Sequence, residues 1–323
     1  MREAWSKTRK PLAPSLAALD DMVAAAFPGA RPLGVRPIAA GVVNDNFRVE
    51  LEGQAPRVVL LRYWRRGLGQ ARTEAALLRR LVGGPPVPAV LGYGEADPEF
   101  YLPYGFLEWV EGERLDQAVD RAGDLAPLGR AAGRLLAAIH GVEFERLGFF
   151  GADLRPESVY DVSVEEQAAW LETVFADPRA ASRLDAPLRA AMLRAVVREG
   201  ASLAAGWAAR PCLSHGDFDA ANIILRADAA GGLEAVALDW EFAFAGGPAF
   251  DFGHLLRPPL GESAPFLEGL CAAYREAGRE LPDDWRRAAN LAELLSLADF
   301  LSRSFCGEDA AAWTLARLRR LAG

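Results

Sequence analysis

The strongest structural signal of the chain lies in LSHGDFDAANIIL at residues 213–225 and, after a Gly-rich gap, LEAVALDWEFAFAGGPAFD at 233–251. NIILR and LEAVALDW have the apolar character of strands, and ADAAGG between them is typical of a turn. Antiparallel pairing would bring the start of the first strand beside the end of the second, so Asn222 and Asp239 become neighbours. Asp217 lies in the loop that enters this hairpin. Two carboxylates and one carboxamide then converge, an oxygen-rich set that suits Mg²⁺ bound together with phosphates.

Position along the hairpin predicts a division of roles among these residues. Asn222 and Asp239, on the paired strand ends, are placed to hold a metal ion, whereas Asp217, on the loop, can accept the proton of an attacking hydroxyl. Glu241 lies two residues beyond Asp239 and would face the same side if the strand continued, as a support or an occasional metal ligand. Alone, Asp217 or Asn222 would more often be a turn or capping residue. Their combination with Asp239 after an apolar strand favours a site.

The chain contains three histidines, and His215 stands closest to this cluster. A hydrolytic triad would need a Ser or Cys nucleophile in a pattern such as G-x-S-x-G, which the sequence lacks. We therefore expect His215 to hydrogen-bond backbone groups around the loop, as structural support. His140 and His254 are expected in the core or in loops. A metal-dependent hydrolase that used His215 with Asp217 and Asp239 would lack the further His ligands it needs.

Composition narrows the classes of protein to which this sequence can belong. Of its 323 residues, 51% are hydrophobic and 25% charged, which favours a large packed core. The formal charge of −8 argues against a nucleic-acid partner. The N-terminus has charges and prolines in place of a secretory apolar region, and no apolar run reaches the ~20 residues that span a bilayer. We expect a soluble, cytoplasmic protein without membrane contact, in which Cys212, Cys271 and Cys306 are buried thiols.

The residue patterns change near residue 111, which predicts two lobes. Upstream, strand-like runs are combined with helical patterns at 15–27 and 72–82. Downstream, Ala, Leu and Arg recur with helical spacing, and only the hairpin interrupts them. The expected fold is α+β, with a small antiparallel sheet and one inserted helix in an N-terminal lobe, residues 1–110, that includes the linker. A larger, mostly α-helical C-terminal lobe, residues 111–323, carries the embedded β-hairpin and the acceptor site.

Two stretches resemble the signature of the aminoglycoside phosphotransferase and choline kinase-like family, relatives of the eukaryotic protein kinases: HGDFDAANIIL and ALDWEFAFAGGPAFDFGHLL. The resemblance implies a two-lobed protein-kinase-like fold, in which H-G-D-x-x-x-x-N supplies a catalytic Asp and a metal-binding Asn, and a later Asp also binds metal. Asp217, Asn222 and Asp239 match these positions. Asp251, in GPAFDFG, resembles the Asp that anchors the catalytic loop from a following helix, a structural role. The order of the motifs matches from about residue 36 to 255.

The resemblance also implies an ATP site in the N-terminal lobe, with a strand cation that faces the phosphates and a helix carboxylate that braces it. Arg62 in VVLLRYW and Glu74 in RTEAALLRRL fit these positions. The family often has Lys in place of this Arg, but the only lysines of the sequence are Lys7 and Lys10. A guanidinium can bridge two phosphate oxygens, so Arg62 can bind the nucleotide phosphates in place of a Lys. An edge-strand surface arginine is the alternative.

Two further segments complete the implied nucleotide site. AAGVVNDNFRVEL resembles the loop that covers the phosphates, with Gly41 at its turn and Asn44 close by, although it is not G-x-G-x-x-G and Asn44 is equally typical of a turn. FLEWVEGERL fits the linker between the lobes, where backbone groups near Glu108 and Val110 would pair with adenine. An ordinary strand end is the alternative for that segment.

The residues and the resemblance together predict an ATP-dependent, Mg²⁺-requiring kinase that phosphorylates a hydroxyl of a small-molecule acceptor. A cationic acceptor, such as an aminoglycoside, an amino alcohol or an amino sugar, is favoured if acidic residues of the C-terminal helices line the cleft; a solvated helix face is the alternative. Those residues are Glu262, Glu268, Glu276, Asp283, Asp284, Glu293 and Asp299. A nucleotide-binding pseudokinase without turnover is the second hypothesis, supported by Arg in place of Lys. The sequence leaves open whether ATP or GTP is the donor.

Overall fold

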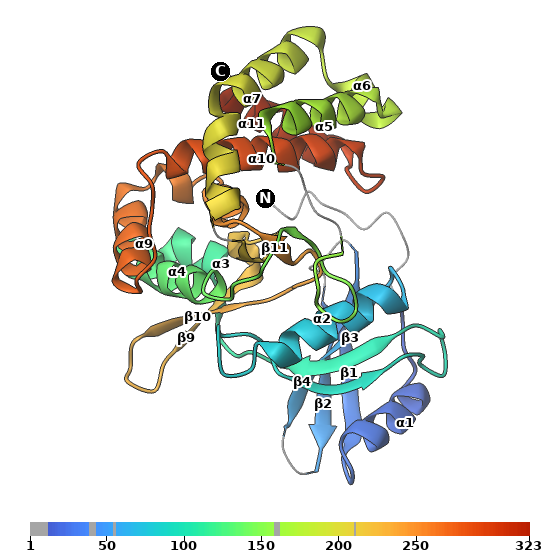
Figure 1. The fold of residues 1–323 in the computed structure, drawn as a ribbon. Coiled ribbons are helices and arrows are strands. Elements are labelled where there is room, and N and C mark those ends of the chain that lie inside the picture. Colours follow the sequence, from blue (N-terminus) through green and yellow to red (C-terminus); the bar gives the residue numbers. More distant parts are fainter. Residues whose placement is uncertain (1–11, 39–42, 54–55, 158–161, 210) are drawn as a thin grey trace.

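The computed structural model describes residues 12–38, 43–53, 56–157, 162–209 and 211–323. Within these ranges a β-rich N-terminal part lies at one end of the molecule and a larger helical part at the other, as Figure 1 shows. Both contribute to the site described below.

The N-terminal part is built on one five-stranded antiparallel sheet with the spatial order β1-β2-β3-β5-β4. The strands are β1 Arg31–Ile38, β2 Asp45–Glu52, β3 Val58–Tyr63, β4 Val90–Gly94 and β5 Tyr104–Glu108. Side chains of β2 alternate between buried and more exposed positions, as expected of a strand with one face on a core. Helix α1, Leu16–Ala26, packs on β1 and β4 and buries Leu19 and Val23 against the sheet. The sheet therefore has its own small core.

Helix α2, Leu68–Arg80, follows β3 and connects the sheet to the helical part. Its Leu77 and Leu78 are buried in the large hydrophobic cluster that also contains residues of the C-terminal helices. The apolar spacing predicted this helix, although it begins at Leu68, four residues earlier than expected. Because α2 shares its core with the helical part, it fixes the orientation of the sheet above the site.

The helical part contains two hydrophobic clusters. One surrounds α4 and α9 and includes Leu136, Phe252 and Leu270, and the other includes Leu171, Met192 and Leu294. The helices are α3 Leu115–Arg121, α4 Ala126–Ile139, α5 Val164–Ala176, α6 Pro178–Arg183, α7 Ala186–Ala209, α8 Pro248–Leu255, α9 Ala264–Glu276, α10 Trp285–Ser302 and α11 Glu308–Ala322. Across the described ranges, none of the helices combines the length and the apolar character needed to cross a membrane.

Two small three-stranded sheets lie within the helical part, in the orders β10-β9-β6 and β7-β11-β8. Their strands are β6 Glu113–Arg114, β7 Gly148–Phe149, β8 Cys212–Ser214, β9 Ile223–Ala227, β10 Leu233–Ala237 and β11 Phe244–Gly246. The β9–β10 hairpin matches the expectation, whereas β6, β7, β8 and β11 were not predicted. Strands of two or three residues are too short to show a period-two pattern.

The second hairpin strand ends earlier than the sequence suggested. It stops at Ala237, and Asp239 has a φ of +66°, a conformation that interrupts an extended chain. The strand therefore does not continue to Glu241, because the chain turns between the two residues, although Asp239 and Glu241 both line the cavity described below.

The three cysteines are free thiols. Cys212 and Cys306 are buried, as expected, whereas Cys271 is only half-buried on α9. Burial raises the pKa of the Cys212 thiol, which therefore stays protonated at neutral pH.

Candidate active site

The β9–β10 hairpin brings Asn222 and Asp239 together. Ala237 pairs with Ile223 at the open end of the hairpin, and the next residue, Leu238, donates its backbone N–H to the Asn222 carbonyl oxygen at 2.8 Å. Asp239 follows immediately in its left-handed conformation. A non-glycine residue in this region is unusual, and such strain is concentrated at functional sites because the surrounding contacts must maintain it.

Asp217 lies against Asn222. The Asn222 Nδ2 amide donates to the Asp217 carboxylate at 2.9 Å and to the Asp217 backbone carbonyl at 2.8 Å. Asp219 begins the short 3₁₀ turn that leads to Asn222, and its carboxylate accepts the Ala221 N–H at 3.0 Å. The turn thus fixes the spacing between Asp217 and Asn222 that the sequence motif requires.

Asp251, fully buried on α8, holds the loop that precedes Asp217. Its carboxylate accepts the backbone N–H groups of His215 and Gly216 at 2.9 and 3.0 Å, and His140 Nε2 lies 3.2 Å from it. Burial alone would raise the pKa of Asp251. The hydrogen bond of His140, together with the other polar groups around the carboxylate, outweighs burial and lowers that pKa. Asp251 therefore remains an ionised acceptor inside the core.

His215 is fully buried and bonds to backbone through both ring nitrogens. Nε2 donates to the Leu238 carbonyl oxygen at 2.8 Å, and Nδ1 accepts the Asp217 N–H at 3.3 Å. The ring lies between those of Phe218 and Trp240. His215 thus links the loop that carries Asp217 to the end of β10, next to Asp239.

Arg62 extends from β3 to the same cluster. Its Nη2 donates to Asp239 at 2.6 Å and lies 3.2 Å from Glu74 on α2, while Trp64 Nε1 donates to Glu74 at 2.6 Å. Arg62 is only 2% exposed, so the alternative of a surface arginine is wrong. Burial alone would lower its pKa, but the carboxylates of Glu74, Asp239 and Glu241 outweigh burial and raise it. Arg62 is thus a permanently charged cation between the sheet and the hairpin.

Glu241 contacts residues of the N-terminal part. It accepts Asn44 Nδ2 at 3.0 Å and Gln70 Nε2 at 3.1 Å. Burial and the neighbouring charge of Asp239 raise the pKa of Glu241 to about 8, although Arg62 opposes them. Asn44 is 2% exposed and also accepts the Arg65 N–H at 3.1 Å. Glu241 therefore connects the two parts of the molecule through residues of the β1–β2 connection and α2.

The remaining predicted nucleotide-binding residues lie elsewhere. Glu108 ends β5, and its carboxylate accepts the Ala89 N–H at 3.2 Å. Val110 follows in the connection between β5 and β6, so the described contacts do not join either residue to the Asp217 cluster. Gly41 lies outside the described residues.

The donor set of the cluster fits Mg²⁺. Two carboxylates and one carboxamide converge, and Mg²⁺ in phosphoryl-transfer sites is usually held by one or two carboxylates together with phosphate oxygens and water. In the part of the chain that the structure describes, no three His, Cys, Asp or Glu side chains form a metal cage by themselves. A metal here would therefore be bound jointly with a phosphate ligand.

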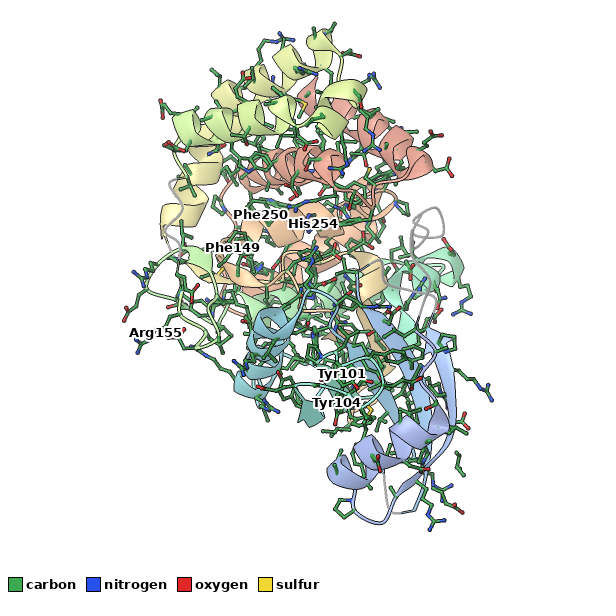
Figure 2. The ribbon with its side chains drawn as sticks, turned by 90° about the vertical axis from the view of Figure 1, so that its right-hand side faces the viewer. Tyr101, Tyr104, Phe149, Arg155, Phe250 and His254 are labelled. Atoms are coloured by element: carbon green, nitrogen blue, oxygen red, sulfur yellow. The ribbon has the colours of Figure 1, made fainter. Side chains whose placement is uncertain are left out.

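A cavity of about 900 Å³ opens beside Asp217 and Asp239. It is lined mainly by side chains of the helical part, and Figure 2 shows two of the lining rings, Phe149 and Phe250, close to His254 between the helices and the sheet. Sequence reasoning did not identify this cavity, because its walls come from elements that are distant in the chain.

Of the two alternatives for the acidic residues of the C-terminal helices, a position in the lining of that cavity holds for one residue only. Of the seven acidic residues named for the C-terminal helices, Asp299 alone belongs to the described lining. Glu293 is buried and forms a bidentate pair with Arg257, at 2.7 and 3.2 Å. Glu262 and Glu276 form ion pairs on the surface. Sequence alone could not distinguish these pairs from a substrate-binding face.

Arg257 is the main site-adjacent residue that the sequence did not reveal. Besides Glu293, it contacts Asp219 at 3.1 Å and lines the cavity. His254, one turn earlier on α8, is 5% exposed and also lines the cavity. Burial lowers the pKa of His254 to about 3, and the charge of Arg257 adds to that effect, so the imidazole stays neutral.

Comparison with known proteins identifies the class of this protein. Residues 34–291 match the model of the phosphotransferase enzyme family. That span is most of the chain, so the chain belongs to this family of phosphotransferases, and the resemblance noted from the motifs is confirmed. No curated protein matches the sequence.

Solved structures of phosphotransferases share the fold of this chain. A thermostable mutant of aminoglycoside phosphotransferase APH(4)-Ia, in ternary complex with AMP-PNP and hygromycin B, has a TM-score of 0.66 at 16% identity and covers 94% of this chain and 97% of its own. The GDP complex of wild-type aminoglycoside 2′-phosphotransferase-IIIa has a TM-score of 0.68 at 17% identity, covering 96% and 99%. Macrolide 2′-phosphotransferase MphH from Brachybacterium faecium, an apoenzyme, has a TM-score of 0.65 at 19% identity, covering 94% and 98%. These similarities confirm the expected two-lobed α+β fold.

Proposed function

We propose that this phosphotransferase transfers the γ-phosphoryl group of ATP to a hydroxyl of a small-molecule acceptor, with Mg²⁺ as cofactor, in the cytoplasm. The proposed nucleotide-binding lobe is residues 1–110 and the catalytic and acceptor-binding lobe is residues 111–323. Asp217 would accept the hydroxyl proton, and Asn222 and Asp239 would hold the metal. Membership of the phosphotransferase family supports the reaction class.

One observation carries the proposal. Asp217, Asn222 and Asp239 converge at the edge of a large cavity, and the buried Arg62 cation contacts the same Asp239 at 2.6 Å. Phosphoryl transfer needs a base, a metal-binding pair and a cation that neutralises phosphate charge, all within a few ångströms. Arg62 Nε is buried and has no hydrogen-bond partner among the described residues.

The proposed chemistry is an in-line displacement. Asp217 takes the proton of the acceptor hydroxyl while the hydroxyl oxygen bonds to the γ-phosphorus, and the bond between that phosphorus and the β,γ-bridging oxygen breaks. ADP leaves with the bridging oxygen. Arg62, braced by Glu74, stabilises the negative charge of the phosphates. Bound Mg²⁺ would supply further neutralisation of those phosphate oxygens.

The proposal is tested by measuring ADP release from Mg²⁺-ATP with a panel of hydroxyl compounds. The comparison is between the wild type, Asp217→Asn and Asp228→Asn. Asp228 is a matched control because it lies in the β9–β10 turn, where its carboxylate only accepts backbone N–H groups of the turn. We expect Asp217→Asn to lower kcat by roughly 10²–10⁴-fold and Asp228→Asn to leave it unchanged.

Nucleotide binding, measured by thermal shift in the same samples, separates the alternatives. Binding of Mg²⁺-ATP without turnover of any acceptor would favour a pseudokinase. Turnover that persists in Asp217→Asn would refute the role of Asp217. We expect chelation of Mg²⁺ to abolish turnover, since Asn222 and Asp239 cannot neutralise phosphate charge themselves.

A further inference from the structure

We propose that the acceptor is a neutral or singly charged molecule with a large apolar body, and that the aromatic cavity beside Asp217 is its binding site. This inference rests on the proposed phosphoryl transfer to a hydroxyl. It deepens that function by assigning the chemical class of the acceptor. The rings, the charges and the size of the cavity support this class.

Aromatic rings form a continuous wall on one side of the cavity. Phe149 of β7 packs on Phe244 of β11 with ring centroids 5.7 Å apart, and Phe244 packs edge-on against Phe250 of α8 at 5.6 Å. All three rings line the cavity. Phe149 remains 55% exposed although it is a large hydrophobic side chain. A ligand that covered this wall would remove apolar surface from water, which is the main favourable term for binding an apolar molecule.

Other elements add rings to the lining. Trp170 of α5, Phe300 near the end of α10 and Phe305 beyond that helix all line the cavity, and the rings of Phe300 and Phe305 lie 5.9 Å apart. In total, seven aromatic side chains of the described residues face this space. Aromatic walls contributed by five separate elements bind molecules through ring faces and edges, so they select for extended apolar surface.

The charges of the lining do not suit a polycation. Apart from the cluster of Asp217, Asp239 and Glu241, the described lining holds two acidic residues and three arginines. The acidic residues are Glu166 and Asp299, and the arginines are Arg66, Arg257 and Arg303. Asp299 is already paired with Arg303 Nε at 2.7 Å. Glu166 is then the one carboxylate outside the cluster for which the described residues provide no ion pair, so several ammonium groups placed among these rings would lose hydration and gain few carboxylate partners, which is unfavourable.

The size of the cavity and its contact with Asp217 define the acceptor further. A volume of about 900 Å³ lies near the upper end of the range for drug-sized ligands, so a small amino alcohol would fill only a fraction of it. Asp217 and Asp239 belong to the same lining as the rings. A hydroxyl that reaches Asp217 therefore leaves the rest of its molecule within the aromatic part of the cavity.

The affinity of candidate acceptors, measured in the presence of a nucleotide analogue that is not turned over, tests this assignment. The full-length protein with Mg²⁺ and AMP-PNP is titrated calorimetrically with erythromycin and oestradiol, which carry hydroxyls on apolar bodies, and with polycationic kanamycin and small choline. We expect at least one of the first two to bind about tenfold or more tightly than kanamycin and choline. Equal or tighter binding of kanamycin or choline would overturn the assignment, and so would a lack of binding by both apolar probes.

Titration with AMP-PNP alone keeps this result separate from the proposed function. If AMP-PNP binds and the apolar probes do not, the acceptor class is wrong while the nucleotide site stands. If AMP-PNP does not bind in the presence of Mg²⁺, the proposed function as an ATP-dependent kinase fails.

Substitution of the aromatic wall gives a second test. Phe149→Ala removes a half-exposed ring, so we expect the fold to be retained and the affinity for the better apolar probe to fall by about tenfold. Phe300→Ala should act in the same direction from α10. Tyr101→Ala is the matched control, because Tyr101 is 79% exposed and lies on the N-terminal part, far from Phe149 in Figure 2. Equal affinity in Phe149→Ala, Phe300→Ala and the control would overturn the assignment.

Discussion

Asp251 and His215 are 36 residues apart in the chain, yet the Asp251 carboxylate accepts the His215 backbone N–H at 2.9 Å inside the core. The same carboxylate accepts the Gly216 N–H, so it holds two consecutive peptide groups of the loop that leads to Asp217. An ionised acceptor that binds two backbone donors fixes the loop more firmly than a neutral one, because charge-assisted hydrogen bonds are stronger. The position of Asp217 thus depends on a residue that is remote from any substrate.

Asp251→Asn should therefore destabilise the protein by about 2–4 kcal/mol and lower kcat. The Asn side chain has nearly the same shape, but its amide nitrogen must face a backbone N–H that it cannot accept. Thermal unfolding and ADP release measure the two effects. Asp228→Asn, in the exposed β9–β10 turn, is the matched control and should lose much less. A variant as stable and active as the wild type would show that Asp251 does not anchor the loop.

The low pKa of Asp251 predicts how this difference depends on pH. A carboxyl group whose pKa is lower in the folded than in the unfolded chain stabilises the fold above the unfolded pKa, about 3.9, and loses that contribution as pH falls through the folded pKa. The titratable groups around it include His140, His215, His254, Tyr274 and the Cys212 thiol. We expect the difference in melting temperature between wild type and Asp251→Asn to be constant from pH 7 to pH 5 and to narrow below about pH 4. A difference that widens in acid would contradict this.

Gly216 meets two separate requirements, and a pair of alanine variants can distinguish them. Gly216 and Gly231 have nearly equal positive φ angles, +77° and +79°. A Cβ on Gly231 meets no atom within 4 Å, whereas a Cβ on Gly216 would lie 2.3 Å from the Phe242 carbonyl oxygen. Gly231→Ala should cost about 1 kcal/mol from backbone strain alone. Gly216→Ala should cost about 3 kcal/mol or more and lower kcat by about 10²-fold, because the loop must move with Asp217.

Chemical denaturation and ADP release of both variants measure these effects. If the free energy of unfolding falls by the same amount in the two alanine variants, the contact with Phe242 does not contribute to the cost of Gly216→Ala. If Gly216→Ala loses stability but keeps full kcat, the position of Asp217 does not depend on this glycine.

Arg62 should contribute to folding as well as to nucleotide binding. Arg62→Met would leave the carboxylates of Glu74 and Asp239 without their buried cation, which should cost about 3–5 kcal/mol and abolish Mg²⁺-ATP binding. Arg62→Lys keeps the charge but cannot present a planar fork to two partners, so we expect intermediate stability and nucleotide affinity weakened about tenfold. Thermal unfolding and titration with a fluorescent nucleotide measure both. Arg72→Met is the control, since Arg72 pairs with Glu95 on the surface. Unchanged nucleotide affinity in Arg62→Met would remove Arg62 from the nucleotide site.

The part of the site that could be predicted from the sequence is the part fixed by local geometry. Asn222 and Asp239 flank a short hairpin, and a hairpin has only one antiparallel register that buries its apolar face. Arg62 and Glu74 could be named only through the family resemblance, because 177 residues separate Arg62 from Asp239. No periodicity in the sequence specifies such a contact between lobes.

The cavity could not be predicted for a related reason. Phe149, Trp170, Phe250 and Phe300 come from four elements, and each ring alone has the pattern of an ordinary core residue. For one of the acidic residues of the C-terminal helices, the sequence suggested exposure where the structure shows burial. Glu293 has the sequence context of a solvated helix residue, but it is fully buried by its pair with Arg257. Charge counted along a helix does not reveal which charges are neutralised by residues from other elements.

The Arg257–Glu293 pair gives a prediction that depends on pH. Glu293 is fully buried, and burial raises its pKa although Arg257 opposes the shift. Arg257→Met should cost about 3–5 kcal/mol, because a buried carboxylate is left without its cation. In that variant the folded pKa of Glu293 rises well above the unfolded value of about 4.3, because the buried carboxylate has lost the charge of Arg257. Glu293 therefore takes up a proton. A raised folded pKa stabilises the fold at low pH and loses that contribution as pH rises, so the deficit of Arg257→Met should shrink from pH 8 to pH 5.

The double variant Arg257→Met with Glu293→Gln separates the protonation of Glu293 from the titration of other groups near the pair. His254, Asp219 and Arg317 also face Glu293 or Arg257, and in the wild type burial and the charge of Arg257 lower the pKa of His254 to about 3, so that imidazole is neutral. Both variants lack the charge of Arg257, so comparing them isolates the effect of Glu293. The double variant should recover much of the stability lost by Arg257→Met at pH 8 and show no improvement toward pH 5, because no carboxyl group remains to be protonated. Denaturant midpoints of the wild type and the two variants at four pH values measure this. If Arg257→Met and the double variant respond to pH in the same way, Glu293 is not the group that titrates, and the energetic role of the pair lies in its contact with Asp219.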